Sequence, residues 1–455
     1  METQKLPKEF KSFIETLLSD EANVFWEALN ESSPVSIRQN LKKKEKHWQQ
    51  ATEIEWCKSG KYLSERPLFT ADPYFHAGCY YVQEAASMFL EQFLNENIEA
   101  DTAITALDLC AAPGGKTTHL ISLLNETSTI VCNEIVPKRN AILCENITKW
   151  GTANTVVTQN EAKDFLPLQN FFDLIVVDAP CSGEGMFRKD VRAIAEWSEK
   201  NVQQCNVRQV EILENIIGTL KENGILLYST CTFEPSENEE KVKWLCSEKG
   251  FEEVKLKSNL LKGIMQSEFG YRFYPHKVKS EGFYIACLRK KSTMSSPDFM
   301  LKNFKKQVQV ISQKQVPSSI QSIVETPDNF QWFLHKNLFN FTNQNTLNKL
   351  LSLEKFLTVK QAGTSVGELK GSDVLLDHAA AVSIYRNGNL PNINLEKEDA
   401  LKFLKGESLN IAAPKGWLAV LFEGVCIGWV KSTASRLNNH YPKHWKIRMD
   451  MAEML

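Results

Sequence analysis

The sequence predicts an α/β fold built on a doubly wound parallel sheet, with smaller modules before and after it. Two observations predict this class. Short apolar, β-branched runs alternate with helical patterns between residues 103 and 290. Two of these runs end in loops that carry polar side chains and cysteines, as the strand ends of such sheets do around ligand sites. No apolar run reaches the ~20 residues that a membrane span needs.

The elements are expected in a simple order along the chain. Residues 6–29 have the spacing of amphipathic helices, 36–50 read as a basic helical segment, and 83–94 as another helix. The expected strands and helices of the sheet region then alternate. The strands are 103–109, 129–132, 155–158, 172–178 and 224–233, with 282–288 as a late antiparallel addition. The helices are 117–124, 137–150 with Pro137 in its first turn, 194–220 and 238–249.

Composition and patterning divide the 455 residues into five parts. Residues 1–75 form a small leading module, and 76–290 hold the parallel sheet. Residues 291–325 are rich in Ser, Lys, Gln and Pro, which is typical of a linker. Residues 326–380 form a small helical or α+β module, with helical patterning over 328–356. Residues 381–455 form a small barrel, in which Trp417–Phe422 and Val425–Val430 make a hairpin around Glu423 and Gly424.

The cysteines and the N-terminus indicate a cellular compartment. Eleven cysteines are scattered without a paired spacing, and the first residues are charged and lack an apolar signal core. Both features favour a cytoplasmic protein with reduced thiols. There is no CxxC or HExxH spacing and the eight histidines do not cluster, so we expect no metal site. The net charge of −2 argues neither for nor against nucleic acid. We expect a monomer.

Cys110–Lys116, with the sequence CAAPGGK, lies between the first strand and its helix. Glycines there let the backbone approach a ligand closely, and the helix N-terminus offers free N–H groups. The loop matches neither G-x-G-x-x-G nor G-x-x-x-x-G-K-[ST], which disfavours a nicotinamide-dependent dehydrogenase and a phosphate cradle. Glu134, at the end of the second strand, stands where such folds hold a ribose diol, although a surface carboxylate is the alternative. Glu161 follows the third strand and could contact an adenine edge, with Asp164 as a rival.

Two neighbouring strand ends deliver reactive side chains. The run 172–178 ends at Asp178 and is followed by Cys181, and the run 224–233 delivers Cys231. The carboxyl ends of parallel strands meet at one edge of a sheet, so these three side chains should share a crevice. A single cysteine is more often a small buried hydrophobe. Two cysteines and an aspartate at adjacent strand ends argue against that interpretation.

Taken together, four segments resemble the Sun/Fmu-type RNA cytosine-C5 methyltransferases. They are CAAPGGK at 110–116, DAPCSG at 178–183, STCT at 229–232 and GCYYVQEAASM at 78–88. The leading segment and NHYPKHWKIR at 439–448 are similar to the RsmF-like branch, which modifies small-subunit ribosomal RNA. The resemblance implies a class I (Rossmann-like) methyltransferase sheet, a leading module of RNA-binding type, and a PUA-like RNA-binding barrel at the C-terminal end.

The same resemblance implies a cofactor and residue roles. The cofactor would be S-adenosylmethionine, with Glu134 at its ribose and Asp178 beside both the cofactor and the target base. Cys231 would attack C6 of cytosine and Cys181 would assist release, while Asp178 could supply a proton if an apolar wall kept it protonated. The family usually has Asp where this chain has Glu161. The residues implied to line the methionine and ribose side are Cys110, Ala111, Ala112, Pro113, Gly114, Gly115 and Lys116.

The expected substrate is an unstacked cytosine in small-subunit, 16S-type ribosomal RNA. Arg188, Lys189, Arg272 and Lys443 are candidates for phosphate contacts, and Tyr441 and Trp445 either stack on RNA or belong to the barrel core. A tRNA cytosine-C5 methyltransferase and a non-catalytic RNA-binding ribosome-assembly protein stay open as alternatives. A methyltransferase acting on proteins or small molecules would have no use for two strand-end cysteines.

Overall fold

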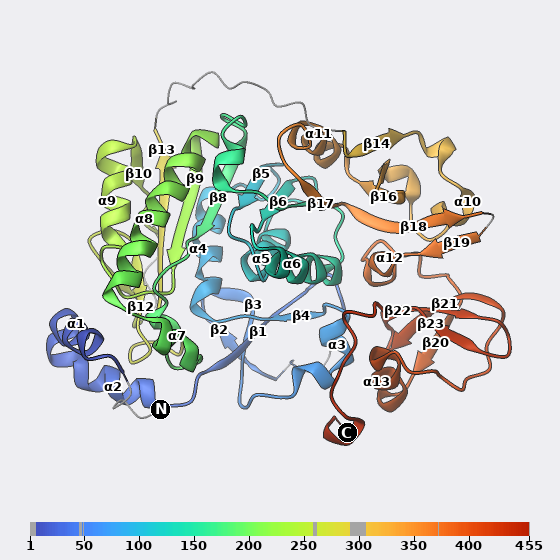
Figure 1. Ribbon diagram of the computed structural model, residues 1–455, viewed down its shortest axis with the longest axis horizontal. Helices are drawn as coiled ribbons and strands as arrows, with labels where there is room; N and C mark the ends of the chain where they lie inside the picture. The colour runs from blue at the N-terminus through green and yellow to red at the C-terminus, as the bar shows by residue number, and fades with distance from the viewer. Residues whose placement is uncertain are drawn as a thin grey trace.

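The computed structural model describes residues 6–44, 48, 50–257, 262–291, 306–371 and 373–454. Figure 1 shows a large mixed sheet with helices on both faces, flanked by three smaller sheets. The α/β fold expected from the sequence is therefore confirmed. Within the described part of the chain, none of the helices has the length and apolarity required to cross a bilayer.

The central sheet has the strand order β11-β12-β13-β9-β8-β5-β6-β7-β17, with β10 paired to β13. Its parallel part runs from β9 to β7, and β13 lies antiparallel beside β9, as expected for a late addition. The chain moves outward from β5 to β7 and then returns to β8 and β9, so the switch point lies between β5 and β8. The strands are β5 (Thr105–Asp108), β6 (Thr129–Asn133), β7 (Thr155–Thr158), β8 (Phe172–Asp178), β9 (Leu220–Thr230), β10 (Phe251–Glu253), β11 (Met265–Gln266), β12 (Tyr271–Phe273), β13 (Phe283–Lys290) and β17 (Val359–Ala362).

The central strands are buried on both faces, which explains their continuous apolar runs. Ala106 and Ile130 contribute to one core cluster, whereas Leu107 and Val131, one residue further along, contribute to the other. The covering helices are α4 (Leu90–Asn97), α5 (Gly115–Leu123), α6 (Pro137–Trp150), α8 (Glu199–Ile216), α9 (Glu239–Glu248) and α11 (Gln344–Leu353). A further helix, α7 (Val191–Glu196), has no buried residue and precedes α8. The single helix expected over 194–220 is two helices, because Ser198 caps a new start by accepting the Asn201 N–H at 3.1 Å.

The leading part of the chain pairs two helices, α1 (Lys8–Leu18) and α2 (Ala22–Asn30), with a four-stranded sheet. The sheet has the order β2 (Thr52–Ile54), β3 (Cys57–Leu63), β1 (Val35–Gln39) and β4 (Tyr80–Val82). The helix expected over 36–50 is wrong, because β1 is extended and pairs with β3 on one side and β4 on the other. Its inward polar residues, Ser36 and Arg38, find buried partners, and this tertiary environment outweighs the helical spacing.

The helix expected over 328–356 is correct only in its second half. The first half is a hairpin of β15 (Gln331–His335) and β16 (Leu338–Thr342), and α11 follows it. Lys336 and Asn337 form the turn with φ of 52° and 66°, a two-residue connection that suits the twist of antiparallel strands. The hairpin belongs to a five-stranded sheet with β14 (Val308–Ile311), β18 (Thr364–Lys370) and β19 (Asp373–Leu376).

The linker expected over 291–325 falls partly outside the described residues, which omit 292–305. Its described part includes β14 and α10 (Ser318–Gln321). Further along, β17 leaves the five-stranded sheet and pairs antiparallel with β7, so it extends the central sheet. A strand from the segment after residue 306 therefore forms one edge of the central sheet.

The last part of the chain is a four-stranded sheet with the helix α13 (Lys397–Lys405). Its strands are β20 (Asn392–Leu395), β21 (Gly416–Phe422), β22 (Val425–Ser432) and β23 (Leu437–Asn439). The expected hairpin is present as β21 and β22, with Glu423 and Gly424 at positive φ in the turn. Two short helices, α3 (Pro73–His76) and α12 (His378–Val382), pack against β22.

Candidate functional site

A cavity of about 440 Å³ opens at the carboxyl edge of the parallel strands. Its walls come from the loop after β5, from the ends of β8 and β9, and from the leading sheet. The loop residues that line it are Cys110, Ala111, Ala112, Pro113, Gly115 and Lys116. Asp178 and Cys231 line it from the strand ends, and Tyr81, Gln83 and Glu84 line it from the leading sheet. The sequence-predicted loop, carboxylate and one thiol are thus brought together at one cavity.

The loop after β5 is held from behind by α6. The guanidinium of Arg139 donates to the Ala112 carbonyl at 2.8 Å, and the Asn146 amide donates to the Pro113 carbonyl at 2.8 Å. Gly114 has φ of 114°, a conformation that side chains rarely adopt, and α5 begins at the next residue. The loop therefore presents its backbone and the N-terminus of α5 at the cavity.

Glu134 follows β6, as the sequence predicts, but it is buried and paired. Its carboxylate lies 3.3 Å from the Arg139 guanidinium and accepts the Val136 N–H at 2.9 Å. Glu161 does not line the cavity. It forms an ion pair with Lys163 and a reciprocal capping box with Asp164 at the start of a short helix. The structure thus places the adenine-side candidates Glu161 and Asp164 in local contacts of their own.

Asp178 stands in a polar environment. Its carboxylate lies 2.9 Å from the Lys116 ammonium and accepts the Ser229 hydroxyl at 2.7 Å, and its side chain is 40% exposed. Asp178 therefore has a cation and a hydroxyl as neighbours, and not the apolar wall that would keep its carboxyl protonated. The Lys116 ammonium also lies 5.1 Å from the centre of the Phe283 ring, so one cation links the 110–116 loop, the end of β8 and the start of β13.

The two thiols meet as the strand-end argument predicts. The sulfur atoms of Cys181 and Cys231 are 3.3 Å apart, and the Cys231 N–H points to the Cys181 sulfur at 3.4 Å. The contact with Cys231, together with burial and the charge of Glu237, raises the pKa of Cys181 well above the ordinary value for a thiol. Cys181 therefore holds its proton firmly at neutral pH.

Sequence reasoning missed the residue that supports the Cys181 loop. Glu237 is fully buried and accepts hydrogen bonds from the Ser182 N–H, the Ser182 hydroxyl and the Gln209 amide. The Ser182 hydroxyl oxygen also lies 3.0 Å from the hydroxyl of Thr232, one residue beyond Cys231. The two thiol-bearing loops are thereby tied together. The only signal in the sequence was a carboxylate six residues after Cys231.

Sequence reasoning also missed Asp108, although it ends β5 directly before the 110–116 loop. It is fully buried, accepts the Thr117 hydroxyl at 2.6 Å through one oxygen, and leaves the other oxygen without a partner. Burial raises the pKa of Asp108 to about 7, and the Asp178 charge contributes to the rise. An unpartnered buried oxygen on a cavity wall is a ready acceptor for a ligand.

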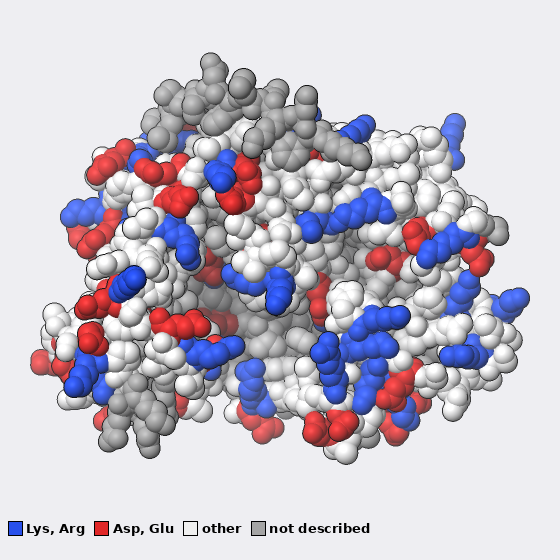
Figure 2. Space-filling model, in the orientation of Figure 1, with Lys and Arg blue, Asp and Glu red and all other residues white. Residues whose placement is uncertain are grey.

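The residues expected to contact RNA divide into two groups. The structure places Arg188 and Arg272 in buried ion pairs, with Glu281 at 3.0 Å and with Glu239 at 2.5 Å. Both guanidinium groups are paired with carboxylates inside the protein. The expectation that they contact phosphate is therefore corrected. Lys189 and Lys443 are exposed, and Lys189 lines the cavity. Figure 2 shows Lys and Arg side chains around the hollowed centre of one face of the molecule.

The aromatic candidates near Lys443 face the protein interior. Tyr441 is buried and its hydroxyl lies 3.1 Å from a ring nitrogen of His76. Trp445 is half-buried, edge-on to His378, with its ring 5.4 Å from the Lys149 ammonium. Tyr441 is core, and Trp445 packs at the junction with α6.

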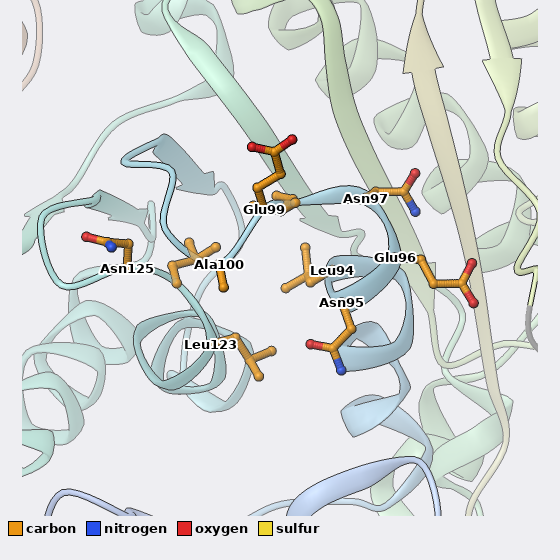
Figure 3. A pocket seen from close by; sticks show the side chains of 10 residues that line it. Leu94, Asn95, Glu96, Asn97, Glu99, Ala100, Leu123 and Asn125 are labelled. Atoms are coloured by element: carbon orange, nitrogen blue, oxygen red, sulfur yellow. The ribbon is translucent and has the colours of Figure 1, made fainter.

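A second cavity lies at the opposite end of α5. It has a volume of about 420 Å³ and is lined by residues 94–100 and 123–125 (Figure 3). The lining has asparagine and glutamate side chains but no thiol or basic group. It offers none of the chemistry that gathers at the carboxyl edge of the sheet.

Comparison with known proteins agrees with this architecture. Residues 95–289 match the model of the 16S rRNA methyltransferase RsmB/F family. Residues 6–85 match the N-terminal domain of 16S rRNA methyltransferase RsmF, and residues 390–447 match the RsmF PUA domain. The PUA domain implied by the resemblance is therefore confirmed, and in the structure its strands form the four-stranded sheet of β20 to β23.

Relatives and solved structures extend the likeness over most of the chain. The ribosomal RNA small subunit methyltransferase F of Aliivibrio salmonicida is 31% identical, covering 88% of this chain and 86% of its own length. The protein of the same name from Vibrio atlanticus is 28% identical, covering 96% and 97%.

Among solved structures, a methyltransferase homologue from Pyrococcus horikoshii superposes with a TM-score of 0.52 at 26% identity, covering 64% of this chain and 100% of that one. NSun6 from the same organism shares the fold, with a TM-score of 0.53 at 23% identity, covering 63% and 98%. Three successive family models and full-length relatives agree, and this chain belongs to the RsmF family of 16S ribosomal RNA methyltransferases.

Proposed function

We propose that this protein transfers a methyl group from S-adenosylmethionine to C5 of a cytosine in small-subunit ribosomal RNA. The observation that carries the proposal is the pair of thiols 3.3 Å apart beside the cavity that Asp178 and the 110–116 loop also line. Family membership supports methyl transfer to 16S ribosomal RNA. The thiols favour C5 of a pyrimidine as the acceptor, because that carbon becomes nucleophilic after a thiolate has added to C6.

The residues at the cavity fit this methyl donor. Gly115 lines the cavity without a side chain, and Asp108, which also lines it, keeps one carboxylate oxygen without a hydrogen-bond partner in the protein. We assign the 110–116 loop and Asp108 to the donor, with Glu134 as the ribose contact. When bound, S-adenosylmethionine supplies an electrophilic methyl group.

Cytosine C5 is a poor nucleophile, and Cys231 is proposed to activate it. The Cys231 thiolate forms a bond to C6, the ring electron pair shifts toward N3, and C5 becomes enamine-like. A proton or a positive charge near N3 stabilises this species. Lys116 and Asp178, 2.9 Å apart on the cavity wall, form a polar pair that can hold the base and share a proton with it.

Cys181 is proposed to act on release. After C5 is methylated, its proton passes to a base, for which Asp178 on the cavity wall is the candidate, and the bond between the Cys231 sulfur and C6 breaks, which returns a thiolate to Cys231. Cys181 retains its proton and lies 3.3 Å from that sulfur, so its S–H can donate to the departing thiolate. The same contact stabilises the attacking thiolate before the bond forms.

A methyl-transfer assay tests the proposal. Purified protein and donor labelled in the methyl group are offered 16S ribosomal RNA, small subunits, tRNA and bulk protein in parallel. We expect label in 16S RNA or subunits, recovered as 5-methylcytosine after digestion. Label only in tRNA would favour the tRNA alternative, and donor binding without transfer to any acceptor would favour a non-catalytic assembly protein.

A further inference from the structure

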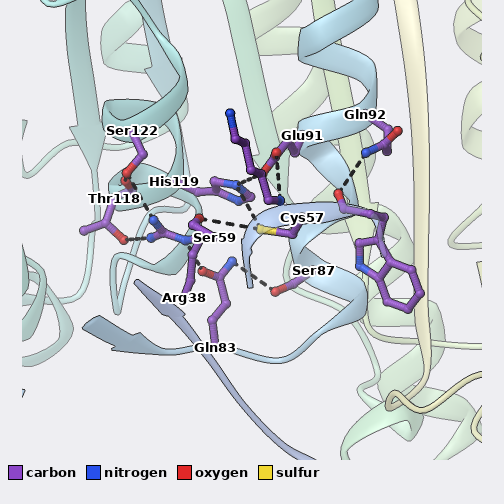
Figure 4. Close-up of polar contacts among 12 residues, drawn as sticks. Arg38, Cys57, Ser59, Gln83, Ser87, Glu91, Gln92, Thr118, His119 and Ser122 are labelled. Carbon is purple, nitrogen blue, oxygen red and sulfur yellow. Dashed lines mark hydrogen bonds and ion pairs between the residues drawn. The ribbon is translucent and has the colours of Figure 1, made fainter. Parts of the chain in front are cut away.

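Arg38 is a fully buried arginine that reaches from the leading sheet into the methyltransferase sheet domain (Figure 4). It lies on β1, and its guanidinium donates to four groups outside that strand. These are the Gln83 side chain at 2.9 Å, Ser122 at 3.2 Å, the Gly115 carbonyl at 3.3 Å and Thr118 at 2.5 Å. Its carbon also lies 4.6 Å from the centre of the Trp150 ring. Such complete pairing is what makes a buried guanidinium tolerable.

Three of the four acceptors belong to the helix that starts at the cofactor loop. Gly115, Thr118 and Ser122 are spaced by three and four residues, so they share one face of α5. Gly115 is both the first residue of α5 and part of the cavity wall. The fourth acceptor, Gln83, lines the same cavity, and its other amide atom donates to Ser87 at 3.2 Å.

The residues after Arg38 hold the neighbouring helix in the same way. Asn40 donates to the Trp150 carbonyl at 3.1 Å, and the Lys43 ammonium donates to the Lys149 carbonyl at 2.5 Å. Both acceptors are carbonyls at the C-terminal end of α6, where unpaired acceptors and the negative end of the helix dipole favour donors and cations. The short segment from Arg38 to Lys43 is therefore hydrogen-bonded to both α5 and α6, the helices that follow β5 and β6.

We propose that Arg38 is a positioning residue for the methyl-donor site. Its planar fork fixes the first turns of α5 against Gln83, and this holds the Gly114–Gly115 turn in the shape that receives the donor. The leading module is then a structural part of the donor site as well as a candidate RNA contact. The inference rests on the proposed donor.

A cluster beside Arg38 has a second interpretation, as a metal site. The ligand atoms of Cys57, Glu91 and His119 lie within 4.8 Å of one another, and among the described residues the group has three members. His119 and Glu91 already share a hydrogen bond of 2.9 Å, and the Cys57 sulfur lies 3.7 Å from the same His119 nitrogen. A divalent ion would leave an excess of positive charge in a buried place. The cluster is therefore a set of side chains hydrogen-bonded to one another beside Arg38.

Calorimetry with S-adenosylmethionine tests the proposal in the full-length protein. Arg38→Met keeps much of the volume and removes the fork, and we expect it to weaken donor binding by ~10-fold or more, the loss of one or two charge-assisted hydrogen bonds. Arg38→Lys keeps the charge but lacks the planar guanidinium. Its donor affinity should lie between those of Arg38→Met and the unaltered protein. The KM for the donor should rise, whereas the single-turnover rate at saturating donor and the RNA affinity should stay near those of the unaltered protein.

Lys290→Met is the matched control. Lys290 is also buried and donates to two backbone carbonyls, but it lies at the far end of β13 from Phe283, which lines the cavity. We expect this control to lower thermal stability without changing donor affinity. Unchanged donor affinity in both Arg38 variants, with stability lowered as in the control, would overturn the inference. Stoichiometric metal that is lost in Cys57→Ser would also overturn the hydrogen-bonded account. If the unaltered protein binds no donor, the proposed function fails instead.

Discussion

At the scale of single residues, the site is defined by two pairs of polar side chains in direct contact. Cys181 with Cys231 and Lys116 with Asp178 are each within 3.3 Å. The role of one residue in a pair cannot be assigned without the other, because the two side chains interact directly. Variants at these positions are therefore best compared by the species that accumulates rather than by rate alone.

The first prediction separates the roles of the two thiols. Cys231→Ala should abolish both methyl transfer and any covalent RNA adduct, because no bond to C6 can form. Cys181→Ala should form the bond, methylate the base and then stall, so an RNA–protein band that survives denaturing electrophoresis should accumulate when donor is present. The double variant serves as the control and should show no band. The reverse pattern would exchange the two roles, and activity retained in both single variants would exclude a covalent mechanism.

The second prediction concerns the pH dependence of stability. Asp108 has its pKa raised to about 7 in the folded protein, against an ordinary value near 3.8. Its stabilising contribution is therefore complete below about pH 4 and is lost as the pH rises through about 7. Asp108→Asn should flatten that decline, which denaturant unfolding between pH 4 and 8 would measure. The exposed Asp373→Asn provides the control. A decline of the same size in Asp108→Asn would show that other groups cause it.

At the scale of elements, sequence patterns predicted the parallel strands of the central sheet well, but missed its outer strands β10, β11, β12 and β17 and predicted the flanking sheets poorly. Helix α6 and strand β7 have the expected bounds, because both-face burial and Pro137 leave strong local signals. β1 and the β15–β16 hairpin were taken for helices, because their identity depends on partners far away in the chain. The thiols could be placed together by the strand-end rule, whereas Glu237 and the capping role of Glu161 depend on loop geometry that no spacing reveals.

The third prediction follows from a close approach between two loops. Gly185 donates its N–H to the Cys231 carbonyl at 2.8 Å, and a β-carbon at Gly185 would lie 2.2 Å from the Gly282 carbonyl oxygen. The same β-carbon would lie 2.7 Å from the Cys231 carbonyl oxygen, so Gly185→Ala must shift the contact between its own loop and the loop that carries Cys231. We expect the methylation rate to fall by ~100-fold with donor affinity unchanged, since small misplacement of a nucleophile costs that much.

Gly388→Ala provides the control for that variant, because nothing lies within 4 Å of the point that a β-carbon would occupy there. Single-turnover kinetics and calorimetry on both variants make the comparison. An unchanged rate in Gly185→Ala would mean that the loop can relax without moving the thiol.

At the scale of the whole molecule, the RNA surface is expected to extend beyond the cavity. Lys189 at the cavity and Lys443 in the C-terminal sheet region are both exposed, in contrast to the buried Arg188 and Arg272. Removing the whole C-terminal part is a poor test of this idea, because it would also take β17 from the central sheet. Single charge reversals leave the architecture in place.

The fourth prediction uses one such reversal. Lys443→Glu should weaken RNA binding and reduce the slope of log affinity against log salt by ~0.7–0.9, the value for one phosphate contact. Fluorescence titrations over a range of salt concentrations would measure the slope. Lys200→Glu on α8 makes the same change in charge elsewhere on the surface and controls for net charge. Equal slopes in the two variants would place Lys443 outside the RNA path.

The pairing of β17 with β7 also has a consequence for how the protein is made. β7 ends at Thr158 and its partner ends at Ala362, so about 200 residues separate them along the chain. At ~5–20 residues per second, the ribosome takes roughly 10–40 s to produce that interval. Throughout it, the nascent sheet carries an open edge with unpaired backbone groups, which other chains could pair with. Nascent chains should therefore be most prone to aggregation, and most dependent on chaperones, during the interval before β17 leaves the ribosome.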